Sequence, residues 1–470
     1  RGSAAARGEA MIPKPRDEPE LIRGLGLVGS AAVVVGTIIG TGIFLVPSSM
    51  ARAVDSVGLV FAVWIVGGLL SLAGALSYAE LGAAMPEAGG EYVFLRRAYG
   101  PMWGFLYGWE QFVIGKTGSI ATIATAFALF LGFFFDSLQE PVVGAGVYTL
   151  NGAQIISLAA ITFLSVVNYL GVVLSGAVQT VFTFLKVAVI LGLVVLGFAI
   201  GNGDWSNFSP FFAAPKGFTG TFSAIGVALV AALWAYDGWN NLVMVGGEIK
   251  DPQRNIPRAL IFGVLGVGLV YMLANAVYFY LLPLAAVKGS TRVAQDAARS
   301  FLGEWGGIIL TVGALISTFA TLNAAILSGA RVPYAMARDR LFLRSMASVH
   351  PVHRTPDNAL LLQGLLSCGL VLIFGQFPDA FDRLFTFTIF GLWIFYGMTT
   401  ASVIWMRHKE PDLHRPYRTL GYPWVPGLFV VLAAVFCVNT LFRNPTETGL
   451  GLAFLVAGLP FYWFWKRRST

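Results

Sequence analysis

Long apolar segments recur along this chain from beginning to end, and they constrain its fold more than any other feature. Each is close to the ~20 residues that an α-helix needs to cross the hydrocarbon core of a bilayer. Charged residues make up 12% of the chain and the mean hydropathy is +0.73, whereas soluble domains carry about 25% charged residues. The sequence therefore predicts an all-α membrane protein.

We expect about twelve transmembrane helices from the apolar runs. Their approximate limits are residues 25–53, 56–84, 101–135, 152–171, 175–201, 219–248, 258–283, 305–332, 357–376, 380–406, 424–442 and 448–465.

The 31 lysines and arginines are distributed unevenly between the two sets of loops. Most lie on the side of the N-terminus, for example Arg96, Arg97 and Arg331, and again at the end of the chain. Because cytoplasmic loops are enriched in Lys and Arg, we expect both termini in the cytoplasm of a cell (plasma or inner) membrane protein. The net charge of +7 is then a topology signal and does not indicate a nucleic-acid partner.

The first expected helix is interrupted near mid-depth. Residues 36–44 read GTIIGTGIF, and the two glycines beside Thr41 lower the helix propensity there. Backbone that leaves a helix inside a membrane is tolerated only against protein or a wet cavity. A helix that restarts after Gly42 would direct N–H groups and a positive dipole end at that cavity. This pattern predicts a carboxylate site in a transporter, although glycines that only allow close helix packing are the alternative.

The sixth expected helix is interrupted in the same way by LWAYDGWN at 233–240. It lies five spans after the first and therefore runs in the opposite direction. Two interrupted antiparallel helices predict a 5+5 inverted repeat with the substrate between the breaks. The expected division of the chain is 1–10 (interpreted as vector-derived), 11–24 (cytoplasmic leader), 25–201 (first repeat), 219–406 (second repeat), 424–465 (two additional helices) and 466–470 (cytoplasmic tail).

Both breaks and several loops resemble the amino acid–polyamine–organocation (APC) superfamily, and within it the L-type amino-acid transporter branch and its bacterial relatives. The resemblance covers most of residues 24–425. It is carried, in order, by SYAELG (77–82), MPEAGGEY (85–92), GEIKDPQRNIP (247–257), GARVPYAMARD (329–339) and RPYRTLGYP (415–423).

The resemblance implies that an amino acid is held by its backbone groups. Thr41 and Gly42 would donate N–H groups to the α-carboxylate. Carbonyls near Ile38 and of Trp234, Ala235 and Asp237 would accept hydrogen bonds from the α-ammonium. Trp234 would also close over the substrate as a gate, with ordinary packing as the alternative. The role of the Asp237 side chain stays open between capping helix ends and facing the cytoplasmic cavity.

Lys186 lies within the fifth expected span, where an ionisable group is a functional candidate by default. In the resembling branch, a lysine at this position is thought to replace the sodium ion that bridges the first and eighth helices in sodium-coupled relatives. Lys186 would then reach carbonyls near Gly36 and Thr37. A transported proton on Lys186 and a purely structural lysine are the alternatives.

Two further polar residues fall near the expected site. Lys116 occupies a position where the branch often has arginine, and it would favour polar or acidic substrate side chains or else pair within the bundle. It is six residues from Glu110, so the two point to different faces of a helix. Asn323 matches a family asparagine near the site, and an interhelical hydrogen bond is its alternative.

The cytoplasmic ends of spans six and eight carry four charged residues that the resemblance implies form a salt-bridge network closing the inner gate. They are Glu248, Asp251, Arg254 and Arg331. The alternative is an ordinary solvated loop face.

The sequence thus predicts a sodium-independent exchanger of L-amino acids that works by alternating access. A proton-coupled symporter and a non-transporting amino-acid sensor are the alternatives. No Ser/His/Asp set, metal-binding cluster or phosphate loop lies at membrane depth, so neither an enzyme nor a metal or cofactor is expected. Residues 136–151 contain no cysteine, so the disulfide-linked heavy subunit typical of the branch is not expected either.

Overall fold

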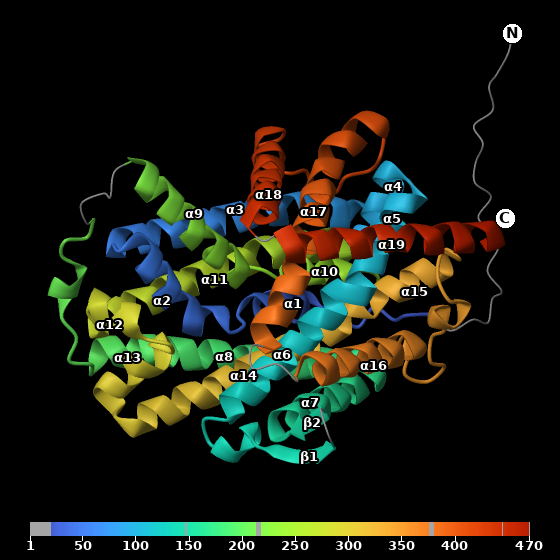
Figure 1. Cartoon of the computed structure of the whole chain (residues 1–470). Coiled ribbons are helices and arrows are strands. Elements are labelled where there is room, and N and C mark those ends of the chain that lie inside the picture. Colours follow the sequence, from blue (N-terminus) through green and yellow to red (C-terminus); the bar gives the residue numbers. More distant parts are fainter. Residues whose placement is uncertain (1–19, 146–147, 213–217, 376–379, 444, 470) are drawn as a thin grey trace, which may run out of the picture.

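The computed structural model describes residues 20–145, 148–212, 218–375, 380–443 and 445–469, so residues 1–10 and most of the expected leader lie outside the described part. Within it, helices form one bundle with a single β-hairpin at its edge (Figure 1). The elements are α1 (Leu27–Ile38), α2 (Gly42–Val54), α3 (Val57–Ala84), α4 (Glu91–Tyr99), α5 (Pro101–Glu110), α6 (Lys116–Leu131), β1 (Pro141–Ala145), β2 (Tyr148–Asn151), α7 (Gly152–Tyr169), α8 (Val172–Ala199), α9 (Phe218–Ala235), α10 (Asn241–Met244), α11 (Pro252–Leu281), α12 (Leu284–Gly289), α13 (Val293–Leu302), α14 (Glu304–Gly329), α15 (Arg331–Arg338), α16 (Asp357–Phe374), α17 (Ala380–Lys409), α18 (Trp424–Arg443) and α19 (Pro445–Ser469).

Nine helical segments of the described residues are long and apolar enough to cross a membrane. The three other expected spans correspond to α9 with α10, to α17 and to α19. Large apolar side chains are exposed on the outer faces of these helices, for example Phe184, Phe262 and Leu365, which are 72%, 69% and 69% exposed. Such surfaces are stable against lipid and unfavourable in water. The prediction of an all-α membrane protein is confirmed.

The first predicted break separates α1 from α2, and residues 39–41 between them are not helical. The second separates α9 from α10, with residues 236–240 in turn conformation. The end of α1 approaches the second break, where the Thr37 hydroxyl donates a hydrogen bond to the carbonyl of Gly238 at 2.8 Å. The start of α2 packs on the end of α9, so closely that a Cβ at Gly42 would lie 2.8 Å from the Cβ of Ala235. The two broken helices are therefore antiparallel, as predicted.

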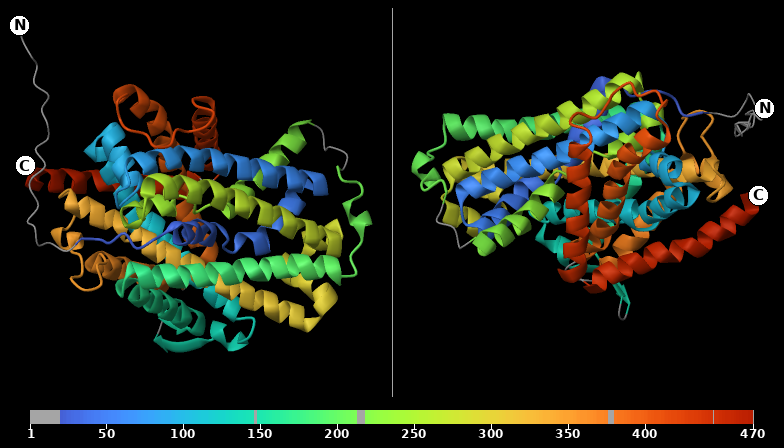
Figure 2. Two further views of the ribbon diagram at one scale, coloured as in Figure 1. Left: turned by 180° about the vertical axis from the view of Figure 1, so that it is seen from behind. Right: turned by 90° about the horizontal axis from the view of Figure 1, so that it is seen from above.

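Neighbouring helices enclose the broken pair. α1 packs against α8, α11 and α14, and α2 packs against α9, α12 and α13. Figure 2 shows α1 and α2 inside the bundle and the hairpin projecting from the edge formed by α7. The breaks consequently lie in the interior of the protein, where freed backbone groups have protein partners.

The third and eighth spans depart from simple helices. Between α5 and α6, Gln111–Gly115 forms a π-helical turn. Such turns are rare in proteins overall, and those that occur are often found at functional sites. The eighth span continues beyond its expected end at residue 332, because α15 follows α14 after a single intervening residue. Pro333 lies in the first turn of α15, where its missing N–H removes no hydrogen bond.

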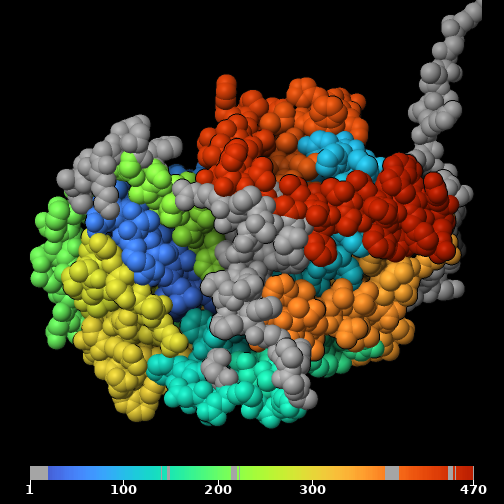
Figure 3. Space-filling model, viewed as in Figure 1, coloured from blue at the N-terminus to red at the C-terminus, as the bar shows by residue number. Residues whose placement is uncertain are grey.

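The two additional helices, α18 and α19, lie on the outside of the bundle against α17 (Figure 3). The loop before α18 is anchored to α3 by the buried Glu80. The carboxylate of Glu80 accepts hydrogen bonds from the Arg407 guanidinium at 3.0 and 2.7 Å and from the N–H of Thr419 at 2.7 Å. The SYAELG and RPYRTLGYP motifs therefore meet in space and fix the C-terminal part of the chain to the core.

Candidate functional site at the two helix breaks

A cavity of about 140 Å³ lies between the two breaks. Helices α6, α14 and α17 complete its wall. The lining residues are Thr37, Ile38, Gly40, Thr41, Gly42, Lys116, Ser119, Thr122, Ile123, Ala126, Trp234, Ala235, Asp237, Gly238, Asn240, Asn241, Thr318, Thr321, Ala325, Leu392 and Tyr396.

The first break presents backbone donors to this cavity. The N–H of Phe44 bonds to the carbonyl of Thr41, which marks the start of α2. The N–H groups in the first turn of a helix have no acceptor within that helix, and the dipole adds partial positive charge there. Thr41 and Gly42 line the cavity at this helix end, in the position predicted for binding a carboxylate.

The second break presents backbone carbonyls, and a tyrosine from α11 joins it to the first. The hydroxyl of Tyr271 lies 3.0 Å from the carbonyl oxygen of Ile38 and 2.9 Å from that of Ala235. Gly238 has a φ of +109°, a left-handed conformation that favours glycine at the turn. Trp234 and Asp237 line the cavity beside these groups.

Lys186 of α8 is fully buried beneath the first break. Its ammonium donates to the carbonyl oxygens of Gly36 at 2.8 Å, Ile39 at 2.6 Å and Ser317 at 3.1 Å, and lies 3.3 Å from the Thr321 hydroxyl. The expected contact with Gly36 is present, whereas Ile39 takes the place of Thr37. The ammonium thus joins the break in the first span to α14 of the eighth.

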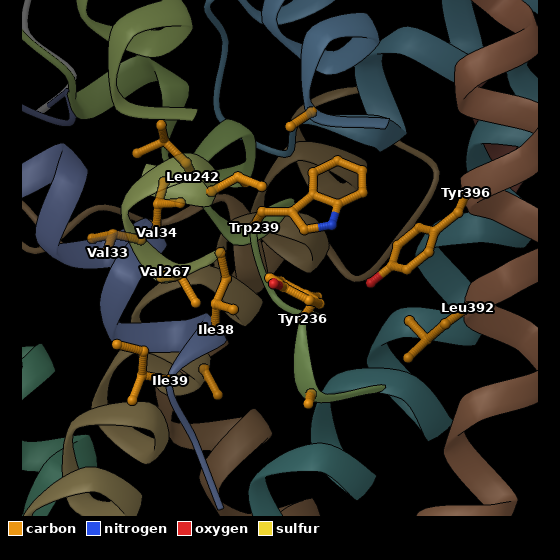
Figure 4. Packing of buried hydrophobic residues seen from close by; sticks show 14 of the residues in the cluster. Val33, Val34, Ile38, Ile39, Tyr236, Trp239, Leu242, Val267, Leu392 and Tyr396 are labelled. Atoms are coloured by element: carbon orange, nitrogen blue, oxygen red, sulfur yellow. The ribbon is translucent and has the colours of Figure 1, made fainter. Parts of the chain in front are cut away.

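Part of the cavity wall is formed by polar side chains. The ammonium of Lys116 and the hydroxyl of Ser328 both donate hydrogen bonds to the side-chain oxygen of Asn241. The hydroxyl of Tyr396 donates to Asp237 at 2.9 Å, and Figure 4 shows Tyr396 reaching inward from α17 toward Tyr236 and Trp239 of the second break. Lys116 lines the cavity while Glu110 lines a separate one, so these two residues point to different faces, as predicted.

Asn323, which was predicted near the substrate, is not among the residues that line this cavity. Its side-chain oxygen accepts a hydrogen bond from Asn168 at 2.9 Å, and its amide donates to Gln179 at 3.0 Å. Asn323 therefore joins α14 to α7 and α8 by interhelical hydrogen bonds, the role given above as the alternative to substrate binding. The other predicted binding residues, Ile38, Thr41, Gly42, Trp234, Ala235, Asp237 and Lys116, all line the cavity.

The expected four-residue cytoplasmic network reduces to one pair. Glu248 and Arg331 are both 0% exposed and are joined by two hydrogen bonds of 2.6 and 2.9 Å. Asp251 and Arg254 are exposed at the start of α11, and in the part of the chain that the structure describes no ion pair connects them to Glu248 or Arg331. The prediction is therefore wrong for Asp251 and Arg254, because α11 begins with a turn that directs them to solvent.

The sequence of this chain matches proteins of known activity over nearly its full length. The profile of the amino acid permease family (AA_permease_2) matches residues 25–463. The chain belongs to the amino acid permease family. It is 34% identical over 451 residues to the serine/threonine exchanger SteT of Bacillus subtilis, covering 95% of this chain and 97% of that protein.

Mammalian members of the family are similar over comparable lengths. The permease is 31% identical over 444 residues to the human b(0,+)-type amino acid transporter 1, covering 93% of this chain and 87% of that protein. It is 29% identical over 453 residues to the human cystine/glutamate transporter, covering 96% of this chain and 87% of that protein.

Three residues that line the cavity or bond to the breaks were missed from the sequence. Tyr271 and Tyr396 lie in long apolar helices, where a tyrosine is normally interpreted as packing. Glu91 is fully buried and accepts hydrogen bonds from Tyr107 at 2.6 Å and Asn240 at 2.9 Å. The GGEY motif that contains Glu91 was recognised, but its contact with the second break depends on a separation of 149 residues that no local pattern shows.

Replacing Gly42 by alanine in the permease is expected to abolish amino-acid binding. The added Cβ would lie 2.8 Å from the Cβ and 2.9 Å from the Cα of Ala235, so the two breaks must separate and the donors of α2 must shift. Binding of labelled amino acid to the purified variant measures the effect. Gly26→Ala is the control, because nothing lies within 4 Å of a Cβ at Gly26. Equal binding by both variants would contradict the assignment of the site.

Proposed function

We propose that this permease is a sodium-independent exchanger of small L-amino acids. The observation that carries the proposal is the cavity between the two breaks, where the first turn of α2 and the carbonyl-rich second break face the same space. N–H donors suit an α-carboxylate and carbonyl acceptors suit an α-ammonium. Every amino acid has both groups, so this part of the site recognises the class while the rest of the wall selects the side chain.

Sodium independence is supported by the position of Lys186. Its ammonium lies among oxygen atoms of the first and eighth spans at 2.6 to 3.3 Å. Carbonyl oxygens that converge on one point can bind either a metal cation or an ammonium, but not both at once. In this permease the cation is part of the chain, so a sodium ion is not required to join α1 to α14.

We further propose that serine and threonine are substrates. The cavity wall also carries Ser119, Thr122, Lys116 and Asn241, which offer donors and acceptors for a hydroxyl. The relative SteT is named as a serine/threonine exchanger. A cavity of about 140 Å³ also favours small side chains over large apolar ones.

Alternating access is supported by the closed inner side. The Glu248–Arg331 pair is fully buried, and the chain before α1 is bonded to the segment after α10 by two backbone hydrogen bonds between Leu25 and residues 248–250. We propose that residues 25–201 and 219–406 form inverted repeats in a cell membrane, with both termini on the cytoplasmic side. During transport the broken helices would rock against the other helices while Trp234 closes over the substrate.

No disulfide-linked heavy subunit is part of this proposal. The two cysteines, Cys368 and Cys437, are free and partly buried in α16 and α18. A partner that binds without a disulfide is tested by whether the purified chain transports on its own.

Exchange is tested with the purified permease in proteoliposomes. We expect uptake of labelled L-serine into vesicles loaded with unlabelled serine to exceed uptake into empty vesicles by about tenfold, with or without sodium, because the empty transporter returns slowly in an exchanger. L-Phenylalanine is the control substrate and is expected to compete poorly. Uptake into empty vesicles driven by an inward proton gradient would instead establish a symporter, and binding without flux would establish a sensor.

A further inference from the structure

A group of buried carboxyls lies behind the substrate cavity with too few cations to balance it. Glu91 and Glu110 are 0% and 2% exposed, and Asp237 lies at the second break. Each of the three interacts electrostatically with Lys116, which is 7% exposed. If every group were ionised, three negative charges would share one positive charge inside the membrane. Such an excess is costly, and a buried group in this position normally becomes neutral by binding a proton.

The hydrogen bonds indicate which carboxyl holds the proton. Both oxygens of Glu91 accept hydrogen bonds, from Tyr107 and Asn240, which stabilises its ionised form. Asp237 accepts from Tyr396 and borders the substrate cavity. Glu110 accepts a single bond, from the side chain of Gln111 at 2.8 Å, and its other oxygen is buried without a partner among the described residues. Glu110 is therefore the least stabilised as an anion.

A water molecule beside Glu110 could supply the proton, and the structure has space for one. A separate cavity of about 10 Å³ adjoins Glu110, with room for roughly one water molecule. Gly391 lines this cavity and provides its space, because a Cβ at Gly391 would lie 2.6 Å from the unpartnered oxygen of Glu110. A Cβ at the nearby Gly115 would lie 3.1 Å from the same oxygen. The remaining lining residues are Ile114, Ile394, Gly451, Leu452 and Leu455.

We propose that Glu110 is a proton-binding site and that its protonated, neutral form supports exchange. The proposal rests on the transport function proposed above. Glu110 is linked to the substrate site through α17, which contacts it at Gly391 and bonds to Asp237 through Tyr396. It also borders the π-helical turn Gln111–Gly115, which sets its position relative to Lys116. Loss of the proton leaves an unbalanced charge between helices that move during transport.

The charged groups that interact electrostatically with Glu110 are Glu91 of α4 and Lys116 of α6. The next groups out are Tyr107 of α5, which bonds to Glu91, and Asp237 of the second break, which bonds to Tyr396 of α17 and also interacts with Lys116. From α19, the described residues beside Glu110 are Gly451, Leu452 and Leu455. Lys116 is thus the sole cation of this group, and Glu91 and Asp237 compete with Glu110 for it.

The test compares the pH dependence of serine exchange in the full-length wild type and in Glu110→Gln, with the same pH on both sides of the vesicle. Wild-type exchange is expected to fall by about tenfold from about pH 6 to about pH 8.5 as the proton is lost. Glu110→Gln is neutral at every pH, so its exchange is expected to stay within about twofold over that range. Glu304→Gln is the control, because this carboxylate is 82% exposed and its loss should leave the wild-type profile unchanged.

A second measurement reads the proton without transport. Infrared absorption of the purified wild type at neutral pH is expected to show a protonated carboxylic acid that disappears in Glu110→Gln and persists in Glu304→Gln. Identical pH profiles for wild type and Glu110→Gln, or no such band, would overturn the proposal. If the wild type binds serine but does not transport it, the proposed exchange fails while the infrared result still decides the protonation of Glu110.

Discussion

Replacing Lys186 by methionine is expected to abolish serine exchange and to lower the stability of the folded permease. Methionine fills a similar volume but donates no hydrogen bond, so the carbonyls of Gly36, Ile39 and Ser317 lose the ammonium that lies at 2.6 to 3.1 Å. Each buried acceptor left without a donor costs about 1–3 kcal/mol. The hydroxyls of Ser317 and Thr321, which also bond to this break, recover part of that loss. We expect a net destabilisation of about 3 kcal/mol, measured by thermal unfolding in detergent.

The same substitution separates the roles considered for this lysine. If Lys186 only stabilises the fold, Lys186→Met should unfold earlier but still exchange serine at temperatures where it is folded. If it holds the first break against α14, exchange is lost even in folded protein, and this is the result we expect. Lys250→Met is the matched control, since Lys250 is exposed and should have no effect. Wild-type exchange by Lys186→Met would contradict a role in the site.

Neutralising Glu248 is expected to weaken the cytoplasmic closure. Glu248→Gln leaves the guanidinium of Arg331 fully buried without its carboxylate, and breaking a buried ion pair in this way costs about 3–5 kcal/mol. The cost falls on the conformation in which the pair is buried, so the inward-open conformation gains population. The measurement is labelling of a cysteine at Ala325, which lines the cavity, by an impermeant thiol reagent added to the cytoplasmic side. We expect labelling of Ala325→Cys to become several-fold faster in the Glu248→Gln background.

The loop beside this pair supplies the matched control. Asp251 is only three residues away but is exposed, so Asp251→Asn should change neither the labelling rate nor the thermal stability. Equal effects of the two substitutions would show that the general charge of this loop, rather than the buried pair, closes the inner side.

The fold could be predicted in large part because its signals are local. Apolar runs of membrane length, glycines within two of them and the bias of Lys and Arg between loops each depend on neighbouring residues. The π-helical turn at Gln111–Gly115 could not be predicted, because its sequence is compatible with an ordinary α-helix. Nor could the junction between α14 and α15, since Pro333 is normally interpreted as the end of a helix.

The candidate site could be predicted where the backbone defines it and much less where side chains from distant segments meet. Thr41, Gly42 and Ala235 lie where the breaks place them. Asn323 lies two residues from both Thr321 and Ala325, which line the cavity, so its side chain projects from another face of α14, and only the packing of the helices shows this. Glu248 and Asp251 look equivalent in sequence, yet the turn between them buries the first and exposes the second.

The tethered cation beneath the first break has a thermodynamic consequence. Because the ammonium of Lys186 is covalently part of the chain, it makes no round trip across the membrane and draws no work from an ion gradient. In the exchange that we propose, one amino acid is traded for another, and the direction of net flow follows the concentration ratios of the substrates on the two sides. Accumulation of any one amino acid must then be driven by the outward supply of another, so other transporters or metabolism would set the pools that this protein redistributes.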